Sequence, residues 1–155
     1  MTYINRVLAK DEHILHQGKI HWIVYARPVV LCIIGISLLI KGSEGGSVEA
    51  LGAAFLFFAA CTWLTAWIER ITTEIAVTSR RVIVKYGLVW RSTMELNAGK
   101  IESVQVNQSV LGRILNFGTV TARGTGSGLE PVRRVDSPLT FRAAIGQLQA
   151  SFTAV

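Results

Sequence analysis

Three histidines near the start of the chain are the residues best suited to bind a metal ion. His13, His16 and His21 lie close together in sequence, and neutral imidazole is a common ligand of zinc and other transition metals. However, no cysteine, aspartate or glutamate stands at a spacing that would complete such a site. We therefore expect surface or interfacial histidines, and we predict neither a metal site nor a bound cofactor.

The serines that could act as nucleophiles lack a base. Ser103, Ser109 and Ser127 have no histidine nearby, and residues 69–155 contain none, which removes the usual activating group. The run Gly124-Thr-Gly-Ser-Gly128 lacks the Lys-Ser/Thr pair that follows a phosphate-binding P-loop. It is typical of a glycine-rich connection between strands. CxxC motifs, HExxH motifs and clustered carboxylates are absent too, so the sequence predicts a protein that is not an enzyme.

Both cysteines lie inside long apolar runs. Cys32 and Cys61 would stand at a similar depth if a turn closes near residues 45 and 46, which leaves a bridge or a metal pair as an alternative. Buried cysteine more often acts as a small apolar side chain, and we favour that interpretation.

Basic residues are the remaining candidates for a binding site. Residues 69–155 hold eleven Lys/Arg and six Asp/Glu, a net charge of +5. Such a domain is attracted to anionic lipid when it is tethered at an inner membrane leaflet, although ordinary charge bias beside a membrane explains the excess equally well. The candidate contacts for lipid headgroups are Arg80, Arg81, Arg123, Arg133 and Arg134.

These residues must be positioned relative to a membrane, because residues 22–68 predict a transmembrane hairpin. Two apolar runs, Trp22–Ile40 and Leu51–Ile68, flank a polar segment rich in glycine and serine. Each run has about the ~20 residues that a helix needs to cross the hydrocarbon core, and the second carries no charge. A soluble helical hairpin, the alternative, would carry charges along one face of each helix.

Small residues repeat along the second run. Gly52, Ala59 and Ala66 recur every seven positions and would let helices approach closely in lipid. We expect them to pack against the first helix of the same chain, with a neighbouring chain as the alternative.

The charged flanks predict the orientation of the hairpin. Basic residues gather on both sides of it, at Arg6, Lys10, Lys19, Arg27, Arg70, Arg80, Arg81 and Lys85. The turn holds only Lys41, beside Glu44 and Glu49. The positive-inside rule therefore places both termini in the cytoplasm, with residues 1–21 as an N-terminal segment and residues 69–155 as a cytoplasmic domain.

The cytoplasmic domain has the pattern of an antiparallel β structure that ends in a helix. Alternating apolar residues predict strands near 73–78, 82–86, 90–96, 101–106, 119–123 and 130–135. A short helical turn is expected over 109–116, closed by Asn116 and Gly118, and residues 14–20 are a further candidate strand. The final helix should begin at Ser137-Pro138. It should bury an apolar stripe of Phe141, Ile145, Leu148 and Phe152.

Several motifs of the domain resemble those of a known family. They are Thr78-Ser-Arg-Arg-Val82, Lys100-Ile-Glu-Ser-Val104, Gln108-Ser-Val-Leu-Gly-Arg113 and Gly118-Thr-Val-Thr-Ala-Arg-Gly124. With the preceding hairpin, they make the chain similar to membrane-anchored bacterial pleckstrin-homology (PH) proteins, the YdbS-like group. The resemblance implies an α+β fold, in which a PH-like antiparallel β-barrel or sandwich is capped by a C-terminal helix. It also implies a location in the bacterial cytoplasmic membrane.

Two binding functions remain open. The favoured one is a membrane-anchored scaffold that assembles with copies of itself or with another membrane protein, because the arginines are spread over several strands rather than clustered in one loop. The alternative is binding of anionic lipid headgroups by the basic surface. Nucleic acid is not an expected partner, because the domain lacks the aromatic and basic interleaving of stacking platforms.

Overall fold

The computed structural model describes residues 4, 7–42, 46–87, 92–125 and 131–153. The chain divides into two units. Residues 22–70 form a helical hairpin, and residues 1–21 together with 71–155 form a β-rich domain. The N-terminal segment therefore belongs to the same unit as the C-terminal half of the chain.

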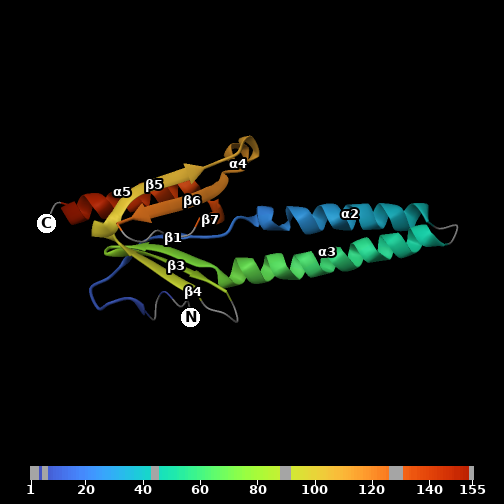
Figure 1. The fold of residues 1–155 in the computed structure, drawn as a ribbon, viewed down its shortest axis with the longest axis horizontal. Helices are drawn as coiled ribbons and strands as arrows, with labels where there is room; N and C mark the ends of the chain where they lie inside the picture. Colours follow the sequence, from blue (N-terminus) through green and yellow to red (C-terminus); the bar gives the residue numbers. More distant parts are fainter. Residues whose placement is uncertain (1–3, 5–6, 43–45, 88–91, 126–130, 154–155) are drawn as a thin grey trace. The chain divides into compact units, whose positions relative to one another are not determined.

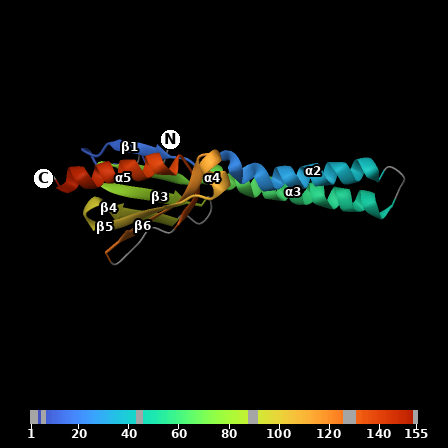
Figure 2. The same cartoon turned by 90° about the horizontal axis from the view of Figure 1, so that it is seen from above.

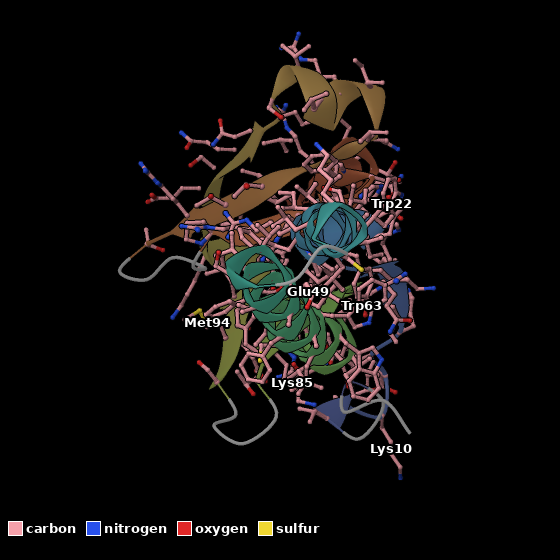
Figure 3. All side chains as sticks on the ribbon, turned by 90° about the vertical axis from the view of Figure 1, so that its right-hand side faces the viewer. Lys10, Trp22, Glu49, Trp63, Lys85 and Met94 are labelled. Carbon is pink, nitrogen blue, oxygen red and sulfur yellow. The ribbon has the colours of Figure 1, made fainter. Side chains whose placement is uncertain are left out.

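The hairpin consists of a short 3-10 helix, η1 (Trp22–Tyr25), and two long helices, α2 (Ala26–Lys41) and α3 (Ser47–Thr72), which run side by side in Figures 1 and 2. Pro28 lies in the first turn of α2, where its missing N–H group breaks no helical hydrogen bond. Both helical spans are long and apolar enough to cross a membrane. Side chains project outward around both helices when the hairpin is viewed along its length (Figure 3).

Glycine allows the two helices to approach closely. A Cβ atom on Gly35 would lie 3.1 Å from the carbonyl oxygen of Gly52, and one on Gly52 would lie 3.1 Å from that of Gly35. Ala59 and Ala66, one and two repeats further along α3, are also buried. The repeating small residues therefore coincide with buried positions of α3, as expected for backbones in close approach.

Aromatic residues gather at one end of the hairpin. The rings of Tyr25 and Trp63 lie 5.0 Å apart, and the Arg70 guanidinium lies 5.6 Å from the centre of the Tyr25 ring. The aromatic cluster is of the kind found where a helix passes through a membrane surface. The two cysteines of the hairpin, Cys32 and Cys61, carry free thiols.

The β-rich domain contains two antiparallel sheets. The first has the order β1 (Ile14–Gly18), β2 (Glu74–Thr78), β3 (Arg81–Tyr86) and β4 (Ser92–Asn97). The second has the order β5 (Ile101–Asn107), β6 (Phe117–Gly124) and β7 (Val132–Asp136). The candidate strand before the hairpin is thus β1, and the predicted strands after it are β2 to β7. Trp90 and Ser127 lie outside the described residues.

Residues just after β1 link the two sheets. Ile20 forms an isolated antiparallel bridge with Val135 of β7. The Asp136 amide donates to the Lys19 carbonyl at 2.9 Å, and the His21 amide donates to the Arg134 carbonyl at 2.7 Å. One continuous segment therefore pairs with β2 in the first sheet and then with β7 in the second.

Two helices complete the domain, α4 (Val110–Ile114) and α5 (Pro138–Thr153). Asn116 adopts a positive φ of 58° after α4, the left-handed conformation expected of the residue that ends a helix. α5 begins at Pro138 as predicted, but the Ser137 hydroxyl accepts a hydrogen bond from Asn116 Nδ2 at 3.0 Å. Ser137 has a positive φ of 48°, which differs from the extended backbone of an ordinary N-cap.

The core of the domain lies between α5 and the sheets (Figures 1 and 2). Phe141, Ile145 and Leu148 are buried as predicted, and α5 contacts strands of both sheets. Phe152 departs from the predicted stripe, because it is exposed and its ring lies over Gly99 instead. The α+β architecture expected from the sequence is confirmed.

The outer face of the first sheet is also covered. The residues that alternate on one face of β2 and β3 are buried, namely Ile75, Val77, Val82 and Val84. Ala76 and Ile83 of the opposite face are fully buried as well. Ile4 of the N-terminal segment is buried, and its amide donates to Glu74 Oε2 at 3.3 Å. Ile4 therefore packs into the β-rich domain beside Glu74, on the same face of β2 as Ala76.

Candidate functional site

A groove of the β-rich domain lies beside the C-terminal half of α5. We call it the α5 groove. Its volume is about 1210 Å³, and its lining is mostly apolar with a basic and polar rim. Residues from four segments line it, namely His13, Leu15, Ser79, Arg80, Asn97, Ala98, Gly99, Lys100, Gln147, Ser151 and Phe152.

Backbone hydrogen bonds fix the rim of the groove. The Ser79 amide donates to the His13 carbonyl at 2.9 Å, and the Ala98 amide donates to the Arg80 carbonyl at 3.0 Å. These bonds join the start of β1 to the β2–β3 turn, and that turn to η2 (Ala98–Lys100), a 3-10 helix between β4 and β5. The rim is therefore held in place before any ligand binds, as is usual for binding sites.

α5 supplies the other wall. Gln149 Nε2 donates to the Ile101 carbonyl at 2.9 Å, which fastens the end of α5 to the start of β5. Phe152 lies over Gly99 and remains exposed, as does Leu15 across the groove. Two exposed apolar side chains inside a concave, basic-rimmed surface are suited to bind a ligand that has both apolar and anionic parts.

Arg80 and Arg81 have different environments although they are adjacent. The Arg80 side chain is 59% exposed at the groove, and its nearest carboxylate is Asp11 at 3.9 Å. The Arg81 side chain is only 22% exposed and donates to Glu12 Oε1 at 3.1 Å, to Glu12 Oε2 at 2.9 Å and to Glu95 Oε2 at 2.8 Å. Arg80 is therefore available to a ligand, whereas the guanidinium of Arg81 is engaged within the fold.

The carboxylate of Glu12 is the centre of this internal cluster. Its side chain is 1% exposed, and it accepts further hydrogen bonds from the Thr78 hydroxyl at 2.6 Å and the Ala9 amide at 3.1 Å. Burial alone would raise the pKa of Glu12, but the hydrogen bonds from Thr78, Arg81 and Ala9 outweigh it and lower the pKa. Glu12 therefore carries a stabilised negative charge inside the domain.

The other candidate arginines lie on the second sheet. Arg123 is exposed on β6, opposite Ser103 of β5. Arg133 is exposed on β7, whereas Arg134 is partly buried and has a positive φ of 58°. None of the three lines the α5 groove among the described residues, so the five arginines do not form one cluster.

The three histidines have three different surroundings. His13 is at the α5 groove, His16 makes an edge contact with Phe141, and the ring of His21 stacks on that of Phe117 with 5.3 Å between centroids. Within the described part of the chain, no group of three or more His, Cys, Asp or Glu side chains is placed to hold a metal ion.

Sequence reasoning missed most of the α5 groove. Lys100 follows Asn97-Ala-Gly99, residue types typical of a turn, and the structure places it in η2 between β4 and β5. Phe152 stood at the end of the apolar stripe of α5. Neither pattern alone shows that these residues meet His13 and Arg80.

The chain also resembles a known protein family. The sequence profile described as Bacterial PH domain matches residues 22–149, a range that includes the hairpin. No curated protein and no solved structure matches the chain significantly.

Proposed function

The chain belongs to the bacterial PH domain family, and from this premise we propose that it is a binding module of the bacterial cytoplasmic membrane. The hairpin anchors the module with both termini in the cytoplasm, and the β-rich domain holds a protein partner. The α5 groove is the observation that carries the proposal. Binding rather than catalysis is the proposed activity.

The surface of the hairpin supports the membrane anchor. Residues 28–40 and 50–68 contain no charged side chain, and large apolar side chains are exposed along both helices. Among them are Ile33, Ile36, Leu51, Phe57, Phe58 and Leu64. In water, an exposed apolar surface of this extent would favour aggregation, whereas lipid removes it from water. The uncharged range of α3, residues 50–68, has 19 residues and covers about 28 Å of helix, close to the thickness of a bilayer core.

The shape and chemistry of the α5 groove support a protein partner. Leu15 and Phe152 provide an apolar floor and wall, and Arg80 and Lys100 provide charge at the rim. A peptide segment with an apolar side chain next to an acidic one could contact the apolar side chains and pair with the basic ones. The partner is another membrane protein or a second copy of this chain.

Photocross-linking in membranes tests the proposal. A photoreactive benzoylphenylalanine in place of Leu15 should give discrete protein adducts, because position 15 faces the groove. The matched control is Gln105, an exposed residue of β5 outside the groove. Equal adducts at both positions, or only lipid adducts at position 15, would contradict a protein partner.

Anionic lipid remains the second candidate ligand, because Arg80 and Lys100 give the groove a basic rim. If headgroups bind there, the chain reconstituted in neutral membranes should recruit anionic liposomes, with a steep loss on adding salt. The combination Arg80→Glu with Lys100→Glu should abolish that recruitment. A protein partner predicts weak recruitment at physiological salt and no effect of the double charge reversal on it.

A further inference from the structure

Helix α4 exposes three large apolar side chains on a single turn. Val110 is 76% exposed, Leu111 is 66% exposed and Ile114 is 73% exposed, and Arg113 beside them is exposed as well. Three neighbouring exposed aliphatic side chains on a five-residue helix form a patch that usually marks an interaction surface.

The local structure holds this patch outward. The Ser109 hydroxyl caps the helix by accepting from the Gly112 amide at 3.1 Å. Gln108 Nε2 donates to the carbonyl oxygens of Gly112 at 3.3 Å and Phe117 at 3.2 Å. A Cβ atom on Gly112 would lie 2.6 Å from the Phe117 carbonyl oxygen, so the glycine face of α4 must point toward Phe117. The apolar side chains therefore cannot turn inward without breaking these contacts.

The patch lies at the end of the domain from which the chain enters the hairpin. β6 begins at Phe117, with two residues between it and the end of α4, and the Phe117 ring stacks on that of His21. The amide of His21 is bonded to the Arg134 carbonyl. Trp22, the next residue, already belongs to the hairpin, so no linker separates this end of the domain from the anchor.

We propose that α4 inserts Val110, Leu111 and Ile114 into the interfacial region of the bilayer that holds the hairpin. Arg113 would then lie at the level of the lipid phosphates, where its stem stays in apolar surroundings and its guanidinium binds phosphate oxygens. The covalent connection between His21 and Trp22 brings this end of the domain to the surface of the membrane that holds the hairpin. Lipid is therefore the expected partner of the α4 patch. The inference rests on the proposed membrane anchor and is independent of the α5 groove.

Site-specific fluorescence quenching tests the inference on the full-length protein in vesicles of phosphatidylcholine with a minority of phosphatidylglycerol. An environment-sensitive fluorophore is attached through Leu111→Cys in a chain that also carries Cys32→Ala and Cys61→Ala. Lipids with a nitroxide quencher high on the acyl chain should quench this label several-fold more than a label attached through Ser103→Cys, the matched control on β5. Aqueous iodide should quench it several-fold less.

A third label, attached through Ile36→Cys in the interior of α2, reports on the anchor itself and is measured with a nitroxide placed deep on the acyl chain. Lipid quenching at position 36 with full iodide access at position 111 would overturn the α4 inference and leave the membrane anchor intact. Protection of position 111 from iodide without lipid quenching would also overturn it, because another protein would then cover the patch. Absence of lipid quenching at position 36 would contradict both the anchor and the inference.

Discussion

At the residue scale, the pairing of the buried Glu12 with Arg81 explains why Arg80 and Arg81 have different environments. A buried carboxylate is stable only when it is paired and fully hydrogen-bonded, and Glu12 has partners in Arg81, Thr78 and the backbone. Arg81 thereby stabilises the fold, which leaves Arg80 as the member of the pair able to bind a ligand.

Substitution of the two arginines should therefore have unequal effects. Arg81→Ala should lower the free energy of unfolding by roughly 3 kcal/mol, because it leaves Glu12 buried without its cation. Arg80→Ala, the matched control, should change it by less than about 0.5 kcal/mol. Urea unfolding of the β-rich domain, followed by circular dichroism, measures both. Equal effects would show that the pair does not stabilise the domain as the structure indicates.

The lowered pKa of Glu12 gives the domain a defined response to acid. Because the folded-state pKa lies below the ordinary value of 4.5, the stabilisation is fully present above about pH 4.5. It is lost as the pH falls through the folded-state pKa. Unfolding measured between pH 7 and pH 3 should show a smaller loss of stability for Glu12→Gln than for the wild type. A wild-type acid response that Glu12→Gln leaves unchanged would argue against this assignment.

At the scale of elements, the β-rich domain is completed by residues 1–21, which precede the hairpin in the sequence. β1 pairs with β2, Ile20 bridges to β7, and Glu12 binds Arg81. Ile4 is buried, and its amide donates to Glu74 of β2. Without residues 1–21, the fragment 71–155 would expose the edge of β2 and the buried face around Ile83, and unpaired edges and exposed apolar faces favour aggregation.

This arrangement predicts different behaviour for two soluble fragments. Residues 71–155 alone should be poorly folded, whereas residues 1–21 joined to 71–155 through a flexible glycine-serine linker should fold, because the linker replaces only the hairpin. Amide dispersion in NMR spectra and cooperative thermal unfolding distinguish the two outcomes. A well-folded fragment 71–155 would show that β1 and the N-terminal segment are dispensable.

At the scale of the whole molecule, the hairpin and the basic flanks define a topology that can be measured. A reporter that is active only in the cytoplasm should work when fused after residue 155 and fail when inserted at residue 45. The reason is that basic residues are retained on the cytoplasmic side, and the turn holds only Lys41 beside two glutamates. The reverse pattern would overturn the orientation and with it the proposed cytoplasmic position of the α5 groove.

The sequence by itself determined the features that depend on local pattern. Long apolar runs predicted α2 and α3, alternation predicted the strands, and the spacing of Phe141, Ile145 and Leu148 predicted the buried face of α5. Each of these signals is contained in a short window of residues, because the periods of helices and strands are local. The motifs also indicated the family that the profile match supports.

Contacts between residues far apart in the sequence depend on the packing of the whole domain. Glu12 and Arg81 are 69 positions apart, and the α5 groove is assembled from four segments. A single sequence carries no local signal for such encounters, since they depend on how the sheets pair and where α5 packs. The same packing gave the side chains of Arg80 and Arg81 different environments and placed Phe152 at the surface over Gly99. It also brought α4 to the end of the domain where the chain enters the hairpin.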